Sequence, residues 1–227
     1  MEADLKKEIF MLVDGSAIVH RAYHAMPPLT RVDGTPTGAV QGFFSMILKI
    51  IAELRPAHIA IAFDRPAPNF RKELFKDYQS QRLAMDSDLS PQFGIIQKIL
   101  ESAKIPVYSV DGLEADDIIG TISEKAKQTG HLVYILTGDR DMLQLVNGKT
   151  KVLAPFKGIS EMTLYTEAKV KEKYGVSPSE FVELKALMGD NSDNYPGVSG
   201  VGPKTATDLI KEYKSVKNVY KNIDKIK

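Results

Sequence analysis

The segment Ile9-Phe10-Met11-Leu12-Val13-Asp14 carries the pattern that decides the fold, a short apolar run that ends in an aspartate. Similar apolar runs follow at Ala57–Phe63, Val107–Val110 and His131–Thr137. Runs of this length, rich in β-branched residues and bounded by turn residues, are typical of buried strands. The sequence therefore predicts four buried strands, with Asp14 at the end of the first.

Helical patterns lie between these strands. Gly38–Leu54 repeats apolar residues at helical spacing, Pro91–Ala103 follows an N-cap at Ser90, and Glu114–Gln128 ends at Gly130. Strands that alternate with helices form βαβ units. We therefore expect an α/β fold with a central, mostly parallel sheet flanked by helices.

The chain changes character near residue 166. Two peripheral strands, Thr150–Ala154 and Met162–Tyr165, are followed by short helices predicted over Glu167–Tyr174, Ser179–Met188 and Pro203–Lys214. We expect an α/β core over residues 1–166 and a helical subdomain over 167–227. Residues 65–90 form an insertion that is longer than a strand-to-helix connection requires.

Composition excludes several classes of protein. The 227 residues are 43% hydrophobic and 26% charged, as in a soluble globular protein. No apolar run reaches the length of a membrane span, and Met1–Phe10 lacks the apolar core of a signal peptide. The absence of cysteine excludes disulfides, thiolate nucleophiles and Cys-ligated metals. A cytoplasmic location fits these features.

Nine acidic residues are expected to meet at one edge of the sheet. Three directly follow strands, where open α/β sheets bind ligands, three open a helix beside that edge, and three lie in turns: Asp14, Asp64, Asp139, Glu114, Asp116, Asp117, Asp141, Asp190 and Asp193. Taken singly, an aspartate after a strand is most often a turn or cap residue. The formal charge is +1, but without these nine acids 30 basic residues face 20 acidic ones, a charge of +10.

Such a set of acids requires a counter-charge. Two unit charges 4 Å apart repel by roughly 4 kcal/mol at an effective dielectric near 20. A few such pairs match the whole stability of a domain, ~5–15 kcal/mol. Arg140 and Lys185 are the nearest basic residues in sequence. Oxygen ligands without His or Cys select Mg²⁺ or Mn²⁺, and two such ions together serve phosphodiester hydrolysis without a protein nucleophile.

Two further segments suit nucleic acid. Residues Gly197-Val198-Ser199-Gly200-Val201-Gly202-Pro203-Lys204-Thr205 form a glycine hairpin before a helix, which permits a backbone grip on phosphates. The alternative is a simple helix–helix turn. The insertion interleaves basic and aromatic residues, with Arg71, Phe75, Tyr78 and Arg82 on one side of a predicted helix beside Lys72 and Lys76. The alternative there is an ordinary amphipathic helix.

Several motifs together point to one family. They comprise Leu12–Ser16, Arg21–Ala25, Pro36–Ala39, Phe63-Asp64, Glu114–Asp117, Thr137–Asp141, Met188–Asn194 and Gly197–Ala206. Over essentially the whole chain, the sequence resembles the 5′-nuclease domain of bacterial DNA polymerase I, the bacterial branch of the flap endonucleases. The resemblance implies a PIN-like core, a helical arch in the insertion, and a helix–hairpin–helix-type DNA-binding subdomain.

The resemblance also implies an activity and its residues. The activity is Mg²⁺-dependent cleavage of DNA at 5′ flaps and 5′ ends, in replication and repair. Asp14, Asp64, Glu114, Asp116 and Asp117 match a first metal cluster, and Asp139, Asp141, Asp190 and Asp193 match a second. Catalytic candidates are Arg21, Tyr78 and Arg82; DNA-binding candidates are Arg71, Lys72, Lys76, Gly197, Gly200, Gly202, Lys204 and Thr205. A K⁺ ion at Gly197–Gly202 is also implied.

Two features depart from the family pattern. Gln79 stands where the arch usually has a lysine, and the chain ends at Lys227, before the usual end of the DNA clamp. We therefore expect a fragment of a longer protein, with a polymerase domain as a candidate partner on the same chain. A monomer associated with the bacterial nucleoid is expected. The alternatives are a PIN-type ribonuclease and a non-catalytic module that binds DNA junctions.

Overall fold

The computed structural model describes residues 8–82 and 84–226. The residues outside the described part are 1–7 and 227, at the two ends of the sequence, and 83, in the predicted insertion. Its centre is a sheet of six strands in the order β3-β2-β1-β4-β5-β6. The strands are β1 (Ile9–Asp14), β2 (His58–Ala62), β3 (Val107–Tyr108), β4 (Leu132–Leu136), β5 (Thr150–Lys157) and β6 (Glu161–Tyr165). Only β6 is antiparallel to its neighbour, so the expected mostly parallel sheet is confirmed.

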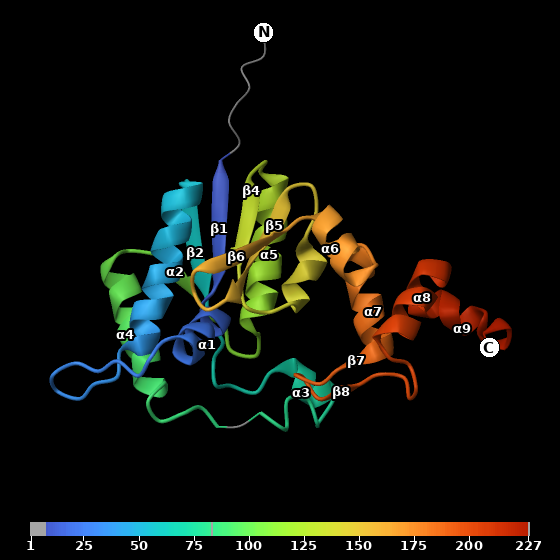
Figure 1. The fold of residues 1–227 in the computed structure, drawn as a ribbon, viewed down its shortest axis with the longest axis horizontal. Coiled ribbons are helices and arrows are strands. Elements are labelled where there is room, and N and C mark those ends of the chain that lie inside the picture. Colours follow the sequence, from blue (N-terminus) through green and yellow to red (C-terminus); the bar gives the residue numbers. More distant parts are fainter. Residues whose placement is uncertain (1–7, 83, 227) are drawn as a thin grey trace, which may run out of the picture.

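Helices cover both faces of the sheet (Figure 1). The helices α1 (Gly15–Ala25), α2 (Gly38–Leu54) and α4 (Ser90–Ser102) pack on one face, and α5 (Ala115–Gln128) packs on the other. Side chains on β1 alternate between two hydrophobic cores, one on each face of the sheet. Met11 and Val13 pack in the core under α1, α2 and α4, and Leu12 packs in the second core, under α5. This two-sided burial is why the strands read as continuous apolar runs.

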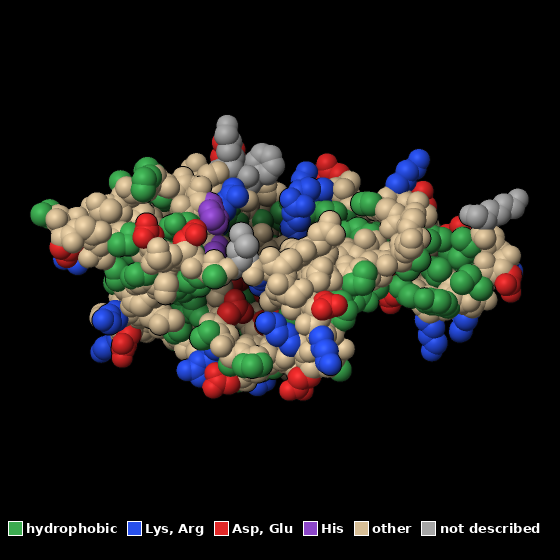
Figure 2. Space-filling view, turned by 90° about the horizontal axis from the view of Figure 1, so that it is seen from below, with side chains coloured by type: hydrophobic (Ala, Val, Ile, Leu, Met, Phe, Trp, Pro, Cys, Tyr) green, Lys and Arg blue, Asp and Glu red, His purple; other side chains and the backbone are tan. Residues whose placement is uncertain are grey.

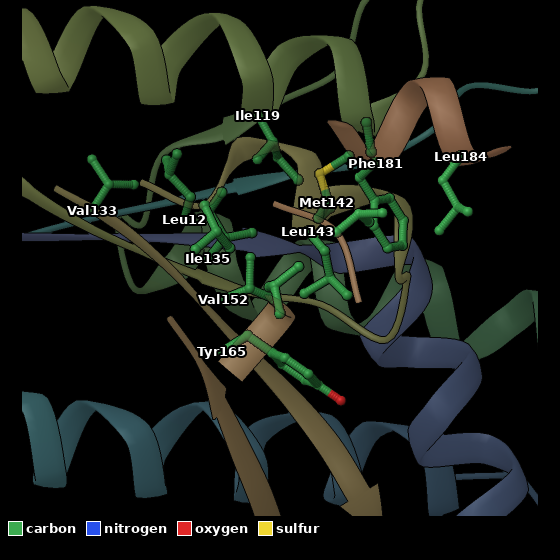
Figure 3. Close-up of a cluster of buried hydrophobic side chains, with 14 of the residues drawn as sticks. Leu12, Ile119, Val133, Ile135, Met142, Leu143, Val152, Tyr165, Phe181 and Leu184 are labelled. Atoms are coloured by element: carbon green, nitrogen blue, oxygen red, sulfur yellow. The ribbon is translucent and has the colours of Figure 1, made fainter. Parts of the chain in front are cut away.

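The second core continues into the C-terminal helices. These are α6 (Glu167–Tyr174), α7 (Phe181–Met188), α8 (Pro203–Tyr213) and α9 (Val216–Lys221), with short 3₁₀ turns at Asp141–Leu145, Pro178–Glu180 and Ile223–Lys225. Figure 3 shows Phe181 and Leu184 of α7 beside Met142 and Leu143, in the cluster that also holds Leu12 of β1. The helical subdomain is therefore packed against the sheet through shared apolar contacts.

Most predicted helices are confirmed. Gly38–Leu54 and Glu167–Tyr174 have the predicted bounds, and the hydroxyl of Thr166 caps the second by accepting the backbone N–H of Lys169 at 3.3 Å. The predicted helix over Pro91–Ala103 begins one residue earlier, at Ser90.

Three elements differ from expectation. The sequence predicts a buried strand over Val107–Val110, whereas β3 has two residues and both are exposed, because β3 is the edge strand of the sheet. The expected helix through Arg71 and Arg82 is also wrong, since α3 (Phe70–Leu74) is followed by turns. Helix α1, which begins directly after Asp14, has no counterpart among the predicted elements.

The loop from α7 to α8 depends on two glycines. It contains the short antiparallel pair β7 (Gly189–Asp190) and β8 (Tyr195–Pro196). A Cβ added to Gly197 would lie 2.4 Å from the backbone nitrogen of Gly189, so the two chain segments can approach this closely only without side chains. At Gly202 an added Cβ would meet nothing within 4 Å.

This difference predicts opposite outcomes for two alanine substitutions. Gly197→Ala should lower the free energy of unfolding by about 1–3 kcal/mol, because the new methyl group must displace backbone atoms. Gly202→Ala, in the same hairpin, should change it by less than about 0.5 kcal/mol. Urea unfolding of both variants measures the difference, and equal stability of the two would contradict the close-approach explanation.

Candidate metal centre

The strand order of the sheet reverses between β1 and β4. From β1 the chain adds β2 and β3 on one side and β4 and β5 on the other. At such a switch point the connections leave in opposite directions, and a crevice opens at the carboxyl ends of the two strands. Asp14 ends β1 at this position, and Thr137 follows β4.

Asp14 is held by its neighbours on both strands. It caps α1, because its Oδ1 accepts the backbone N–H of Ala17 at 3.0 Å, and its Oδ2 accepts the Thr137 hydroxyl at 2.7 Å. The residue is only 3% exposed. Burial is the main cause that raises the pKa of Asp14 to about 7, and the negative charges of Asp64 and Asp139 contribute to this rise, which the two hydrogen bonds oppose. A carboxylate in this position strongly favours a cation beside it.

Asp116 lies among the same acids at the start of α5. Burial raises its pKa to about 9, and the carboxylates of Asp14, Asp139, Asp64 and Glu114 add to the effect by repulsion. Asp64 is tied to this helix start, because its Oδ1 accepts the backbone N–H of Ala115 at 2.8 Å. In the described part of the chain, neither Lys nor Arg forms an ion pair with Asp14, Asp64, Asp116 or Asp139.

A cavity of about 930 Å³ lies over this group. Its acidic lining residues are Asp14, Asp64, Glu114, Asp116, Asp139 and Asp193. Figure 2 views this side of the molecule and shows Asp and Glu side chains in a central hollow, with Lys and Arg side chains around it. A second cavity, of about 600 Å³, is lined by Asp139, Asp141 and Asp190 among others. Asp139 therefore borders both cavities and links the two groups of acids.

Basic side chains already contact each acid of the second group. Asp141, Asp190 and Asp193 each place a carboxylate oxygen within 4.8 Å of the others. The Lys185 ammonium contacts both Asp141 and Asp190, while Arg82 donates to Asp193 Oδ1 at 2.9 Å. Burial works to raise the pKa of Asp190, but hydrogen bonds from Lys185 and Ser192 outweigh it, so the pKa is lowered.

The residues present fit divalent cations. The first group, which comprises Asp14, Asp64, Glu114 and Asp116, offers only carboxylate oxygens, which hard ions such as Mg²⁺ prefer. Its raised pKa values show that the charged form is disfavoured without a counter-charge. In the second group, Lys185 occupies the position between two carboxylates where a cation would bind. A metal ion there has to displace the ammonium.

Asp117 is directed away from this cavity. Its carboxylate accepts two hydrogen bonds from the Arg71 guanidinium, both at 2.8 Å, and closes a capping box with the backbone N–H of Glu114 at 3.0 Å. The hydrogen bonds from Arg71 lower the pKa of Asp117. Thus eight of the nine predicted acids line the two cavities, and Asp117 instead fixes the helix start and the insertion.

The catalytic candidates occupy different surroundings. Tyr78 is buried, and its hydroxyl donates to Glu114 Oε2 at 3.1 Å, so it is not free to stack on a base. Arg82 lines the larger cavity and is half exposed. Arg21 lies on α1, and its Nε donates to the carbonyl oxygen of Gly158 at 3.1 Å.

The DNA-binding candidates divide in the same way. Lys72 lines the larger cavity and Lys76 is exposed, whereas Arg71 is engaged by Asp117. In the hairpin, Gly197 is packed against Gly189, while Gly200 and Gly202 have open space around them. Lys204 and Thr205 are exposed in the first turn of α8.

The insertion is bonded to the loop that carries Asp193. Gln79 donates to Asp193 twice, from its backbone N–H at 3.0 Å and from its side-chain amide at 2.9 Å. Asn194 donates back to the carbonyl oxygen of Asp77 at 2.9 Å. Segments more than 100 residues apart in sequence are therefore joined at the rim of the cavity.

Comparison with known proteins identifies the family. A family model described as 5′-3′ exonuclease, N-terminal resolvase-like domain, matches residues 9–175. A second, described as 5′-3′ exonuclease, C-terminal SAM fold, matches residues 176–227. The chain belongs to the 5′-3′ exonuclease family. The two matches meet after α6, and the predicted division at residue 166 stays a prediction.

Curated relatives agree with this assignment. The chain is 44% identical over 223 residues to DNA polymerase I of Bacillus caldotenax and 40% identical over 221 residues to that of Bacillus subtilis. The alignments cover 98% and 97% of this chain but 25% of each relative. The resemblance to the 5′-nuclease domain of bacterial DNA polymerase I is thus confirmed, and the chain spans about a quarter of those proteins.

Solved structures share the fold. One is T5 5′-exonuclease with bound zinc, with a TM-score of 0.77 at 23% identity over 95% of this chain and 79% of that one. Another is the catalytic core of Rad2 in complex with DNA substrate, with a TM-score of 0.59 at 22% identity over 95% of this chain and 65% of that one.

In the described part of this 5′-3′ exonuclease chain, no helix is long and apolar enough to cross a membrane.

Three residues of the site were missed from the sequence. Thr137 bonds Asp14, Asn69 donates to Glu114, and Ser16 accepts the backbone N–H of Asp64 at 3.0 Å. Ser16 and Thr137 could have been found from their positions in the sequence, because each lies within two residues of an acid that follows a strand. Asn69 gave no such signal, since the insertion reaches Glu114 only through the fold.

The raised pKa values predict a pH dependence of stability. Folded-state pKa values of about 7 for Asp14 and about 9 for Asp116 exceed the ordinary value of 3.8, so the folded chain holds more protons than the unfolded chain. Without divalent ions, the free energy of unfolding should fall as pH rises from 5 to 8, by about 2 kcal/mol or more at about 1.4 kcal/mol per pKa unit.

Chemical unfolding in buffer with chelator measures this slope. Asp116→Asn should make it shallower, because the amide does not titrate and only the contribution of Asp14 remains. Saturating Mg²⁺ should flatten it in the unaltered protein. Glu124→Gln, an exposed position on the same helix, is the control. Stability that rises over this pH range would contradict the assigned shifts.

Proposed function

We propose that this chain is the nuclease part of a bacterial DNA polymerase I and hydrolyses DNA phosphodiesters at 5′ ends and 5′ flaps, using two Mg²⁺ or Mn²⁺ ions. The observation that carries the proposal is the convergence of Asp14, Asp64, Glu114, Asp116 and Asp139 on one cavity at the switch point of the sheet. The family match and the structural likeness to nucleases solved with metal ions and with DNA support it.

The acids of the first group would hold one ion, and Asp139, Asp141, Asp190 and Asp193 would hold the other. Bound divalent ions of this kind supply positive charge to the scissile phosphate and activate water. The chain's own side chains orient the ligands, since Thr137 fixes Asp14 and Tyr78 fixes Glu114. Arg82 and Lys72 line the same cavity and would attract the phosphates of the flap.

The glycine hairpin would bind the duplex beside the flap. The open space around Gly200 and Gly202 lets a phosphate approach the backbone, and the exposed Lys204 and Thr205 lie next to it at the start of α8. Carbonyl groups of the Gly197–Gly202 turn would hold a K⁺ ion against that phosphate. The remaining proposals are a polymerase domain on the full-length chain, a monomeric state and a cytoplasmic, nucleoid-associated location.

Cleavage of a labelled 5′-flap DNA tests the proposal. Asp116→Asn should reduce the Mg²⁺-dependent rate at least about a hundredfold, because it removes an essential charge while keeping the shape. Its affinity for flap DNA in chelator should be retained or improved, since the cavity becomes less negative. Glu124→Gln serves as the control on α5. A rate unchanged in Asp116→Asn would overturn the metal assignment.

The same assay separates the alternatives. A flap made of RNA that is cut faster than the DNA flap would favour a PIN-type ribonuclease. Tight flap binding with no cleavage in Mg²⁺ or Mn²⁺ would favour a non-catalytic junction-binding module. A blunt duplex completes the comparison, because a flap-specific enzyme cuts it more slowly.

Gln79 offers a second test at the cavity rim. Gln79→Lys adds a positive charge beside the proposed phosphate path and should raise the cleavage rate about tenfold, a gain of roughly 1.4 kcal/mol in transition-state stabilisation. Gln81→Lys adds the same charge two residues away, at an exposed position that does not line the cavity. If both variants cleave at the original rate, charge at position 79 does not act on the phosphate.

A further inference from the structure

The end of the sheet opposite the acidic cavity brings together three side chains of types that can ligate a metal ion. Glu8, His58 and His131 each place a ligand atom within 4.8 Å of the others. His58 Nε2 lies 3.4 Å and His131 Nε2 lies 3.6 Å from the same atom, Glu8 Oε2. Ligands bound tetrahedrally to zinc at 2.0–2.2 Å are separated by roughly 3.3–3.5 Å, so each histidine nitrogen already has nearly that spacing from Glu8 Oε2.

The fold brings these three residues together at the starts of neighbouring strands. Glu8 precedes β1, His58 is the first residue of β2, and His131 precedes β4. Backbone hydrogen bonds fix the register, from Leu132 N–H to the Glu8 carbonyl at 3.0 Å and from Ala57 N–H to the Ile9 carbonyl at 2.9 Å. The positions of the ligands are therefore set by the sheet and not by flexible loops.

The Thr129 hydroxyl lies beside the ring of His131. It is 2.9 Å from the Ala126 carbonyl oxygen and 2.8 Å from His131 Nδ1, so when it donates to the carbonyl it accepts from Nδ1. In neutral His131 the lone pair is then on Nε2, which faces Glu8. This is the arrangement that orients imidazole ligands in metal sites, where the second ring nitrogen donates to a neighbouring acceptor.

Phe10 packs beside both rings. Its ring centroid lies 5.8 Å from that of His58 and 6.3 Å from that of His131, and the two imidazoles lie 5.2 Å apart in an edge-to-face arrangement. The apolar ring restricts the movement of both histidines. The outer side is open, because His58 and Glu8 are largely exposed, so water can complete the coordination.

We propose that Glu8, His58 and His131 form a binding site for Zn²⁺ or a similar transition-metal ion, which links the starts of β1, β2 and β4. Two imidazoles and one carboxylate suit such ions and are a poor set for Mg²⁺. The site lies away from the acidic cavity and does not depend on the nuclease function. The alternative is an ordinary surface ion pair between Glu8 and protonated histidines.

Zinc titration of the full chain tests the proposal. Saturating Mg²⁺ is added first to occupy the carboxylate cavity, and isothermal titration with Zn²⁺ alone then compares the original protein with the His58→Asn/His131→Asn double variant. We expect one zinc site that the double variant lacks. Thr129→Val should weaken binding about 10–100-fold, because it releases the orientation of His131 without removing a ligand. Equal binding by the original protein and the double variant would overturn the proposal.

Two further measurements identify the ligands. The chain has four histidines, so ¹⁵N spectra of their side chains should show zinc-dependent shifts for His58 and His131 and none for His24, an exposed histidine elsewhere. The Tm should rise by about 5 °C or more at a hundredfold excess of zinc over Kd, and not in Glu8→Gln. Shifts confined to His20, which lines the acidic cavity, would place the zinc there and refute the new site. Flap cleavage in Mg²⁺ should be unchanged by His58→Asn, so this test and that of the nuclease function fail independently.

Discussion

Repulsion between buried carboxylates is the constraint on which the site depends. Asp14 and Asp116 are held against each other at the crevice between β1 and β4, and burial makes each charge costly. The free energy gained by burying the two hydrophobic cores, one on each face of the sheet, offsets this repulsion. Crowding like charges brings no folding advantage, so a pair of this kind indicates a functional site, and carboxylate oxygens gathered in one cavity suit the binding of divalent cations.

The start of α5 shows how the chain separates structural acids from functional ones. Asp116 and Asp117 are adjacent in sequence, but successive helical residues point about 100° apart. Asp117 reaches back to cap the helix and to bind Arg71, while Asp116 points into the cavity. One of the two acids therefore lowers the cost of forming the helix end that presents the other.

How far the sequence predicts this molecule depends on the range of the interactions involved. Strand-end acids such as Asp14 and Asp64 could be placed together, because parallel strands align their carboxyl ends. Helix α1 could not, since Asp14-Gly15-Ser16 also reads as a turn and only the capping bond to Ala17 distinguishes the two. The surroundings of Tyr78 were equally hidden, because its contact with Glu114 spans 36 residues and lies outside any helix.

The two groups of acids differ in what a cation must displace. In the described part of the chain, Asp14, Asp64 and Asp116 of the first group form no ion pair with Lys or Arg, and only Glu114 has a basic partner, Arg71 at 3.8 Å. A divalent ion beside the three unpaired acids relieves their repulsion directly. In the second, Lys185 and Arg82 already supply charge, and Gln79 and Arg82 both donate to Asp193 Oδ1. Because Gln79 and Arg82 belong to the insertion, a metal ion that takes this oxygen competes with the bonds that hold the insertion on the cavity rim. If the second group binds a metal ion as proposed, this binding and the docking of the insertion would be coupled, and each would weaken the other by the same free energy.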